Sequence, residues 1–266
     1  MEFITMDLSV IVPCYKQENT IKQDLKNILS DLDKTRFSYE LIAVVDGFLD
    51  KTYPRAKQMR NPKLRVHGYK TNKGKGYAVR YGMARAKGDF VAFIDSGMDI
   101  DPNGISLIME HMYWYDADVM VGSKRHPASK LVYPARRKFF SIGLQYLQRL
   151  LFGLKLRDTQ AGLKVFKRGV LEKVLPRLII KRFAFDIELL VVIKHLGYSR
   201  IFEAPIKVNW AENSLKSDWE TLIKSSWNFF VDMLGVFYRL NILGYYDDKS
   251  KRKWVYDKEL AMRVNV

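Results

Sequence analysis

Short apolar runs rich in β-branched residues alternate with segments of helical periodicity along the first half of the chain. This alternation is typical of βαβ units, in which a crossover helix joins neighbouring parallel strands. The apolar runs predict strands over residues 8–12, 40–45, 64–67, 89–94 and 117–121. The periodic segments predict helices over residues 18–32, 52–60, 76–86 and 102–115. We therefore expect an α/β protein with a doubly wound, mostly parallel sheet and helices on both faces.

The second half is less regular and contains more basic and aromatic residues. It predicts helices over 136–152 and 185–195, strands over 164–166 and 203–210, and amphipathic helical structure over about 219–246. We expect a catalytic domain over 1–212, an amphipathic segment over 213–246 that contacts a membrane interface or a second subunit, and a charged, loosely held tail over 247–266.

Composition limits the classes of partner. The 45 basic and 29 acidic residues give a net charge of +16, which attracts nucleic acid, phosphorylated small molecules or anionic lipid headgroups. A single cysteine, Cys14, excludes an intramolecular disulfide, and its place at the end of an apolar run indicates a buried thiol in a reducing compartment. Asp232 and Arg239 interrupt the most apolar C-terminal region, and the first residues read as a strand and not as a cleaved leader. We expect no membrane span.

Polar residues follow the predicted strands where each strand ends. Doubly wound sheets bind ligands at the carboxyl ends of their parallel strands, so these residues are the first candidates for a site. The segments that follow the strands lie at residues 13–15, 46–47, 95–101 and 122–125.

Three aspartates, Asp95, Asp99 and Asp101, come directly after the predicted strand 89–94. Carboxylate oxygens there suit Mg²⁺ or Mn²⁺ and leave coordination positions for phosphate oxygens. The alternative is a turn with a helix cap, which suits Asp101 because Pro102 follows it. We assign Asp101 to a cap and Asp95 to a metal, since an unpaired carboxylate at the buried end of a strand is unfavourable.

Other polar segments have two open interpretations. Residues 72–76 contain two glycines before a helix, and they form either a phosphate-binding turn or a simple glycine turn. Residues 158–162, Asp186 and Glu188 serve either a site or a structural role, which for Asp186 is a helix cap and for Glu188 a solvated face. Asp186 and Glu188 are two apart on a helix and point in different directions, so at most one faces the site. The sequence contains no His and Cys set for zinc and no Ser, His and Asp arrangement for acyl transfer.

Together these segments resemble the inverting glycosyltransferases of the GT-A fold, family 2, and within that family the dolichyl-phosphate glucose and mannose synthases. The most specific match is Asp-Thr-Gln-Ala-Gly at 158–162 followed by Phe-Asp-Ile-Glu at 185–188. Further matching segments lie at residues 10–15, 45–52, 72–80, 95–99, 122–124, 163–166 and 208–210.

The resemblance implies a role for each matching residue. It implies a catalytic set of Asp95, Lys124, Arg137 and Asp186. It implies nucleotide-sugar contacts from Pro13, Tyr15, Glu18, Asp46, Lys75, Arg80, Asp95 and Ser96. It implies an acceptor-phosphate site of Arg137, Ser141, Asp158 and Gln160. It implies Mg²⁺ or Mn²⁺ on Asp95; Gly97 departs from the family, which usually has a second Asp there, so we expect Asp99 to supply the missing carboxylate.

The function that follows is inverting transfer of a hexose, glucose or mannose, from a UDP- or GDP-sugar to a polyprenyl phosphate. Such an acceptor is already ionised, whereas a saccharide or protein acceptor, the nearest alternative, would need a general base, with Asp186 or Glu188 as candidates. A basic nucleic-acid-binding protein is the third interpretation, and the acidic loop at 95–101 argues against it.

A lipid acceptor requires contact with a membrane, and we expect a peripheral protein at its cytoplasmic face. Residues 219–246 and the apolar face of the basic helix 136–152 are the candidate contacts. The alternative is ordinary packing of these helices onto the sheet or into a homodimer. The apolar face of the basic helix consists of Phe139, Phe140, Leu144, Leu147 and Leu151.

Overall fold

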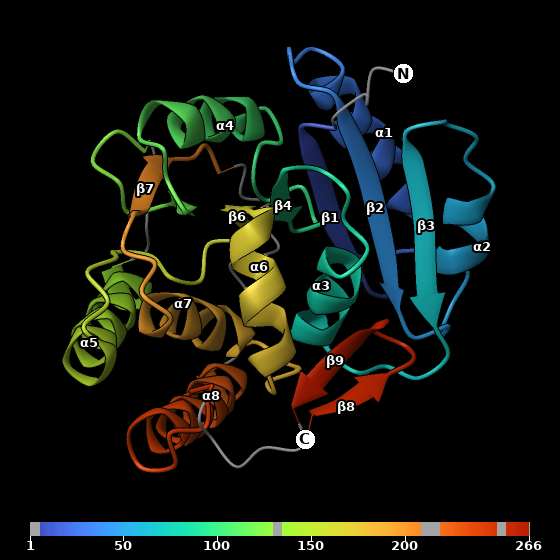
Figure 1. Ribbon diagram of the computed structural model, residues 1–266. Helices are drawn as coiled ribbons and strands as arrows, with labels where there is room; N and C mark the ends of the chain where they lie inside the picture. The colour runs from blue at the N-terminus through green and yellow to red at the C-terminus, as the bar shows by residue number, and fades with distance from the viewer. Residues whose placement is uncertain (1–5, 130–134, 209–218, 249–253, 266) are drawn as a thin grey trace.

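The computed structural model describes residues 6–129, 135–208, 219–248 and 254–265; for 135–141 and 219–226 it describes the backbone alone. A seven-stranded sheet in the order β3-β2-β1-β4-β6-β5-β7 forms the centre of the molecule (Figure 1). All neighbouring strands pair in parallel except β6, which is antiparallel to both β4 and β5. The strands are β1 (Leu8–Cys14), β2 (Tyr39–Asp46), β3 (Leu64–Tyr69), β4 (Phe90–Ile94), β5 (Val119–Ser123), β6 (Leu163–Lys167) and β7 (Ile201–Pro205).

Helices cover both faces of the sheet, which confirms the predicted α/β architecture. On one face α1, α2 and α4 pack over the strands, and on the other face α3, α6 and α7 do so, with α5 and α8 against their outer side. The helices are α1 (Ile21–Leu32), α2 (Thr52–Lys57), α3 (Lys75–Met83), α4 (Gly104–Trp114), α5 (Ala135–Phe152), α6 (Arg168–Val174), α7 (Phe185–His195) and α8 (Trp219–Asn241).

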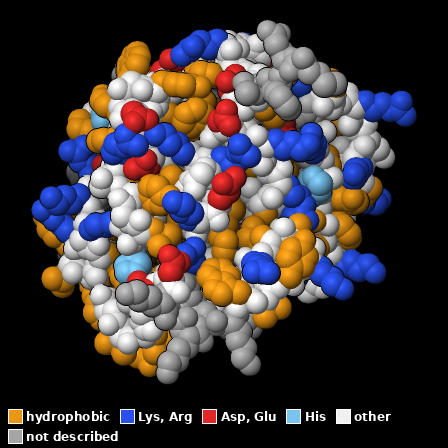
Figure 2. Space-filling view, in the orientation of Figure 1, with side chains coloured by type: hydrophobic (Ala, Val, Ile, Leu, Met, Phe, Trp, Pro, Cys, Tyr) orange, Lys and Arg blue, Asp and Glu red, His pale blue; other side chains and the backbone are white. Residues whose placement is uncertain are grey.

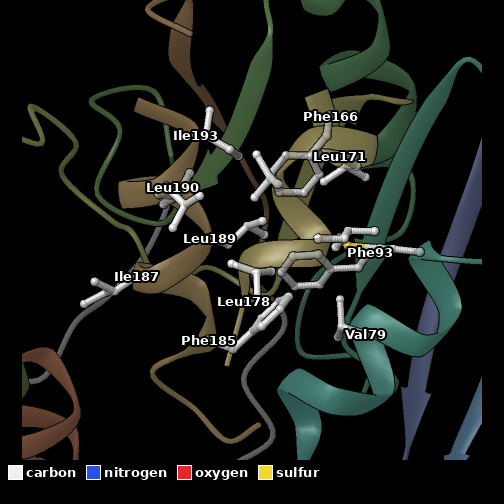
Figure 3. Close-up of a cluster of buried hydrophobic side chains, with 14 of the residues drawn as sticks. Val79, Phe93, Phe166, Leu171, Leu178, Phe185, Ile187, Leu189, Leu190 and Ile193 are labelled. Atoms are coloured by element: carbon white, nitrogen blue, oxygen red, sulfur yellow. The ribbon is translucent and has the colours of Figure 1, made fainter. Parts of the chain in front are cut away.

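The core on the α3 side is built around Phe93 of β4. Its ring stacks at 6.3 Å on Phe166 of β6, and Val79 and Phe185 lie on the helices that cover it (Figure 3). Cys14 is buried on the opposite face, and burial raises the pKa of its thiol, so the prediction of an inert buried cysteine is confirmed. Buried side chains thus pack against both faces of the sheet next to the ends of β1 and β4.

The C-terminal part differs from the sequence prediction. The segment after Asp247 is not loosely held throughout: β8 (Trp254–Asp257) and β9 (Met262–Asn265) form an antiparallel hairpin beside α3, with Leu260 and Val264 buried in the core. The predicted strand 203–210 lies instead at Ile201–Pro205, and Asn209 and Trp210 fall outside the described residues. The short helix α6 and the 3-10 turn Leu175–Arg177 were not predicted.

The two predicted surface helices also pack inward. Leu144, Leu147 and Leu151 of α5 lie against the core, so the packing interpretation is correct for them, while the side chains of Phe139 and Phe140 lie outside the described part. On α8 the inner face buries Phe229, Met233 and Val236. No helix among the described residues is long and apolar enough to cross a membrane.

Candidate active site

The carboxyl ends of β1, β2, β4 and β5 meet at one edge of the sheet, and Asp95 is the first residue beyond β4 there. Its backbone N–H donates to the Gly162 carbonyl at 3.0 Å, and the Lys75 ammonium of α3 lies 2.7 Å from its Oδ1. A methyl group on residue 162 would come within 2.0 Å of Asp95 Oδ2, so only glycine fits beside this carboxylate. Asp95 is therefore held between Lys75 and Gly162 and remains partly exposed.

Asp99 lies on the same loop and is exposed, with its carboxylate near Asp95 and Lys124. Burial and the Asp95 charge raise the pKa of Asp99, and the Lys124 charge opposes this shift. The left-handed backbone of Met98, at φ 56°, turns the chain between the two aspartates. The two aspartates of the predicted pair thus lie on one loop, within electrostatic range of each other.

This pair suits a divalent cation that is shared with a ligand. The described residues contain no cluster of three or more His, Cys, Asp or Glu side chains that would cage an ion by itself. Hard cations such as Mg²⁺ bind through one or two carboxylates and take their remaining ligands from phosphates and water. Asp95 and Asp99 fit that pattern.

Asp186, a candidate base, is buried and already paired. It lies in the first turn of α7, is 5% exposed, and its Oδ1 accepts a hydrogen bond from the Lys164 ammonium at 2.6 Å. Lys164, on β6, is completely buried and also donates to the Ala161 carbonyl at 2.7 Å. The sequence did not single out Lys164; the available signal was a lysine among the apolar residues of a predicted inner strand.

Glu188, the other candidate base, faces the core and not the site. Its Oε2 accepts the N–H groups of Ile179 and Ile180, and its Oε1 accepts the Tyr246 hydroxyl at 2.8 Å. Burial raises the pKa of this carboxyl, while those bonds lower it. The interpretation of Glu188 as a possible general base is wrong, because its whole carboxylate ties α7 to the turn before it and to the C-terminal region; the solvated-face alternative is wrong as well.

Asp46, at the end of β2, organises the loop at 72–74. Its carboxylate accepts the N–H groups of Lys73 and Gly74, the Asn72 amide and the Tyr69 hydroxyl. The Tyr77 N–H at the start of α3 donates to the Lys181 carbonyl. These amides already have partners, which favours the glycine turn over a phosphate cradle, while the ammonium of Lys75 points to Asp95.

The remaining residues of the predicted nucleotide set lie in different surroundings. Ser96 is 7% exposed and donates to the Pro13 carbonyl at 2.8 Å, so it joins the ends of β4 and β1. Tyr15 is exposed beside them, and Glu18 accepts the Lys51 N–H. Arg80 differs: it lies on α3 with its side chain turned into the interior, is 7% exposed and donates to the Leu178 carbonyl at 2.7 Å, which makes it a core residue.

The predicted acceptor loop is held by hydrogen bonds that the sequence did not reveal. Asp158 accepts the N–H groups of Lys124 and Gln160, each at 3.2 Å, and so joins this loop to the end of β5. Glu203 of β7 accepts the Asp158 N–H, and Gln148 of α5 pairs with the Thr159 hydroxyl. Asp158 therefore shapes the loop, Gln160 lies within it, and the side chains of Arg137 and Ser141 lie outside the described part.

Comparison with known proteins gives a consistent result. Residues 9–175 match the family model described as glycosyl transferase family 2. The dolichyl-phosphate beta-glucosyltransferase of Drosophila melanogaster is 33% identical over 226 residues, which cover 78% of this chain and 68% of that protein. The protein of the same description from Homo sapiens is 30% identical over 226 residues, with the same coverage of both chains.

A solved structure shows the same fold. It is glucosyl-3-phosphoglycerate synthase from Mycobacterium tuberculosis in complex with Mn²⁺, UDP and phosphoglyceric acid, and it superposes with a TM-score of 0.65 at 21% identity. The match covers 87% of this chain and 78% of that one. This likeness confirms the predicted GT-A fold.

Proposed function

The chain belongs to glycosyltransferase family 2 and is a glycosyltransferase, and we propose that it transfers glucose with inversion from UDP-glucose to a polyprenyl phosphate of the dolichyl type. The names of the relatives support glucose and a dolichyl phosphate acceptor. The UDP in the solved neighbour supports the uridine nucleotide over GDP, and with it glucose over mannose.

The observation that carries the acceptor class is the state of the two candidate bases. Asp186 is buried against Lys164, and Glu188 is fully bonded inside the core. A sugar or protein hydroxyl needs a base to remove its proton, whereas a phosphate monoester is ionised at neutral pH and attacks directly. A saccharide or protein acceptor is therefore less well supported, because both residues named as its general base are engaged in the interior.

The partly exposed charges at the strand ends suit the departing diphosphate. Asp95 and Asp99 would hold Mg²⁺ or Mn²⁺, which when bound neutralises charge on the diphosphate. The Lys75 ammonium lies 2.7 Å from Asp95 Oδ1, and the charge of Lys124 acts on Asp99. Fixed cations placed where negative charge develops stabilise the transition state more than the ground state, so we assign Lys75 and Lys124 to the leaving group.

We also place a membrane contact on the outward face of α8. Its exposed apolar side chains are spaced by three or four residues, which puts them on one side of the helix, while the opposite side packs into the core. An acceptor with a polyprenyl chain requires such a surface near the enzyme. A buried, unpaired Cys14 agrees with the cytoplasmic side. The exposed residues are Trp227, Val231, Leu234 and Tyr238.

The test is a panel of UDP- and GDP-sugars, each with a polyprenyl phosphate and Mn²⁺ or Mg²⁺, with glycolipid formation as the measurement. We expect turnover of UDP-glucose that stops when a chelator removes the metal. If no donor is turned over with any lipid phosphate, the acceptor assignment is wrong; if a sugar or peptide acceptor reacts instead, the alternative replaces it.

The metal assignment is tested by Asp95→Asn and Asp99→Asn, with Asp101→Asn as the matched control. Asp101 lies on the same loop, and its Oδ1 accepts the Asn103 N–H in the turn before α4; the N-cap position of that helix is Asn103, so the predicted cap role of Asp101 is wrong. We expect the first two changes to weaken Mn²⁺-dependent UDP binding by about tenfold or more, and the control to leave it unchanged. Normal binding by the Asp99 variant would place the second ligand elsewhere.

A further inference from the structure

Lys164 carries a charge in the interior of the protein, close to the candidate site. Its side chain is fully buried on β6, and its ammonium contacts the Asp186 carboxylate, the Ala161 carbonyl and, at 5.0 Å, the ring of Phe93. Burial lowers the pKa of Lys164, and the Asp186 charge opposes that shift. Lys164 is fully buried and Asp186 is 5% exposed, so the ammonium of Lys164 acts on the site through the groups that it bonds.

Stability alone gives a poor reason for this pair. A buried ion pair must overcome the desolvation of both charges, and replacing such a pair by apolar residues is often neutral or stabilising. On its own face of β6 the neighbour of Lys164 is Phe166, which stacks on Phe93, while Leu163 and Val165 belong to the core on the opposite face of the sheet. A buried charge at this position therefore indicates a role other than stability, namely to hold the two groups that Lys164 bonds, the Ala161 carbonyl and the Asp186 carboxylate.

What Lys164 bonds is the segment that encloses Asp95. Ala161, whose carbonyl accepts from Lys164, directly precedes Gly162. Gly162 accepts the Asp95 N–H, and its Cα lies so close to Asp95 Oδ2 that no methyl group fits between them. The orientation of the Asp95 carboxylate therefore depends on where Ala161 and Gly162 lie.

A second connection runs through Lys75. Its ammonium lies 2.7 Å from Asp95 Oδ1 and 5.8 Å from the same Phe93 ring that Lys164 contacts. Burial lowers the pKa of Lys75, and the charges of Asp95 and Asp186 together raise it above its usual value, so Asp186 lies within electrostatic range of the lysine that pairs with Asp95. Two ammonium groups, each paired with an aspartate, thus lie 5.8 and 5.0 Å from the Phe93 ring centre.

We propose that Lys164 is a positioning residue for the metal-binding carboxylate: by holding the Ala161 carbonyl and Asp186 it fixes Gly162 and so keeps Asp95 aimed at the cation. This inference rests on the proposed metal role of Asp95. Residues that orient a metal ligand without contacting the metal themselves typically lower metal affinity by about 10- to 100-fold when they are removed.

The sign of the effect separates positioning from simple electrostatics. Lys164 is positive, so removing its charge would strengthen cation binding if it acted through charge alone. A positioning role predicts the opposite, a weaker affinity. The double variant with Lys164→Met and Asp186→Asn leaves the local net charge unchanged and removes a buried pair together, which avoids the unpaired charge that a single change leaves behind.

The experiment measures Mn²⁺ binding, alone and with UDP, by electron paramagnetic resonance and calorimetry, in Lys164→Met and in the double variant. Lys167→Met is the matched control. Lys167 is the last residue of the same strand, so it lies at the end of β6 away from Gly162, where it pairs with Asp116. We expect the double variant to bind Mn²⁺ about tenfold more weakly than the parent, with the control unchanged.

Parental or tighter Mn²⁺ affinity in the double variant overturns the inference, even if Lys164→Met alone fails to fold. Asp95→Asn distinguishes this failure from that of the proposed function. If Asp95→Asn loses Mn²⁺ and the double variant does not, only the positioning role is wrong; if Asp95→Asn keeps Mn²⁺, the metal site itself is wrong and the positioning role falls with it.

Discussion

At the scale of single residues, Gly162 is the glycine whose replacement would act directly on Asp95. Replacing it by alanine would put a methyl group within 2.0 Å of Asp95 Oδ2, so Asp95 or its loop must move. Misplacement of a catalytic group by about 1 Å costs about 100-fold in rate, so we expect Gly162→Ala to lower kcat/KM by about that factor.

Gly169→Ala is the control for that change, because a methyl group there meets no atom within 4 Å. We expect the control to keep both activity and thermal stability. Steady-state kinetics with UDP-glucose and Mn²⁺ measure the effect, and circular dichroism shows whether the variant folds. A folded Gly162→Ala variant with parental activity would mean that Asp95 does not need its present orientation.

The sequence predicts a site residue when the pattern that marks it is local, and misses it when its bonding partner is distant in sequence. Asp95 follows an apolar run directly, so its position at a strand end could be inferred from local pattern. Lys164 and Asp186 are 22 residues apart and meet only because β6 and α7 pack together. Arg80 shows the converse error: it belongs to a motif near the site, but its position on α3 turns it into the core.

At the scale of elements, the alternating pattern predicted the parallel strands well, because each apolar run has a helix on either side. The direction of β6 was not predictable in the same way, since its antiparallel pairing with β4 depends on the long excursion through α4, β5 and α5. The C-terminal hairpin was missed because its charged residues resemble a tail. Its stability depends on a few apolar contacts with distant elements.

Leu260 tests whether the hairpin is an integral part of the fold. It is 1% exposed in the turn region between β8 and β9 and packs into the main core, whereas Val255 on the same hairpin is 49% exposed. We expect Leu260→Ala to lower the free energy of unfolding by about 2 to 5 kcal/mol, as for other buried leucines, and Val255→Ala to lower it much less. Urea unfolding measures both.

We expect Leu260→Ala to loosen the loop at 72–74 as well. Glu259, next to Leu260, pairs with Lys73 on that loop, and its carbonyl accepts from Arg85 at the far end of α3. The hairpin therefore bridges the two ends of α3. Equal unfolding free energies for Leu260→Ala and the parent would show that the hairpin is a separable tail, as the sequence first indicated.

At the scale of the whole molecule, the net charge of +16 has two possible uses, an anionic substrate site and an anionic surface. Lys and Arg side chains spread over much of the face shown in Figure 2 and are not confined to the strand ends. Among the described residues, Lys75 pairs with Asp95 and the charge of Lys124 acts on Asp99. The rest fits attraction to anionic headgroups, which adds to the apolar face of α8.

These two contributions to membrane binding separate by salt and by mutation. Charges at the surface are screened over about 10 Å at 0.1 M salt, so raising the salt should weaken binding to vesicles that contain anionic phospholipid. Trp227→Ser should weaken it at every salt concentration, because it removes apolar area from α8. Trp114→Ser is the control, since Trp114 is equally prominent, at 71% exposed against 65%, but lies on α4 at the opposite end of the molecule.

Sedimentation with vesicles, and molecular mass measured by light scattering, distinguish a lipid surface from a second copy of the chain. We expect Trp227→Ser to reduce the bound fraction severalfold and the control to leave it unchanged, with the same molecular mass for both. If instead the parent is a dimer that Trp227→Ser dissociates, and vesicles bind neither protein, the apolar face of α8 is a subunit interface. The lipid acceptor would then have to reach Asp95 and Asp99 by another surface.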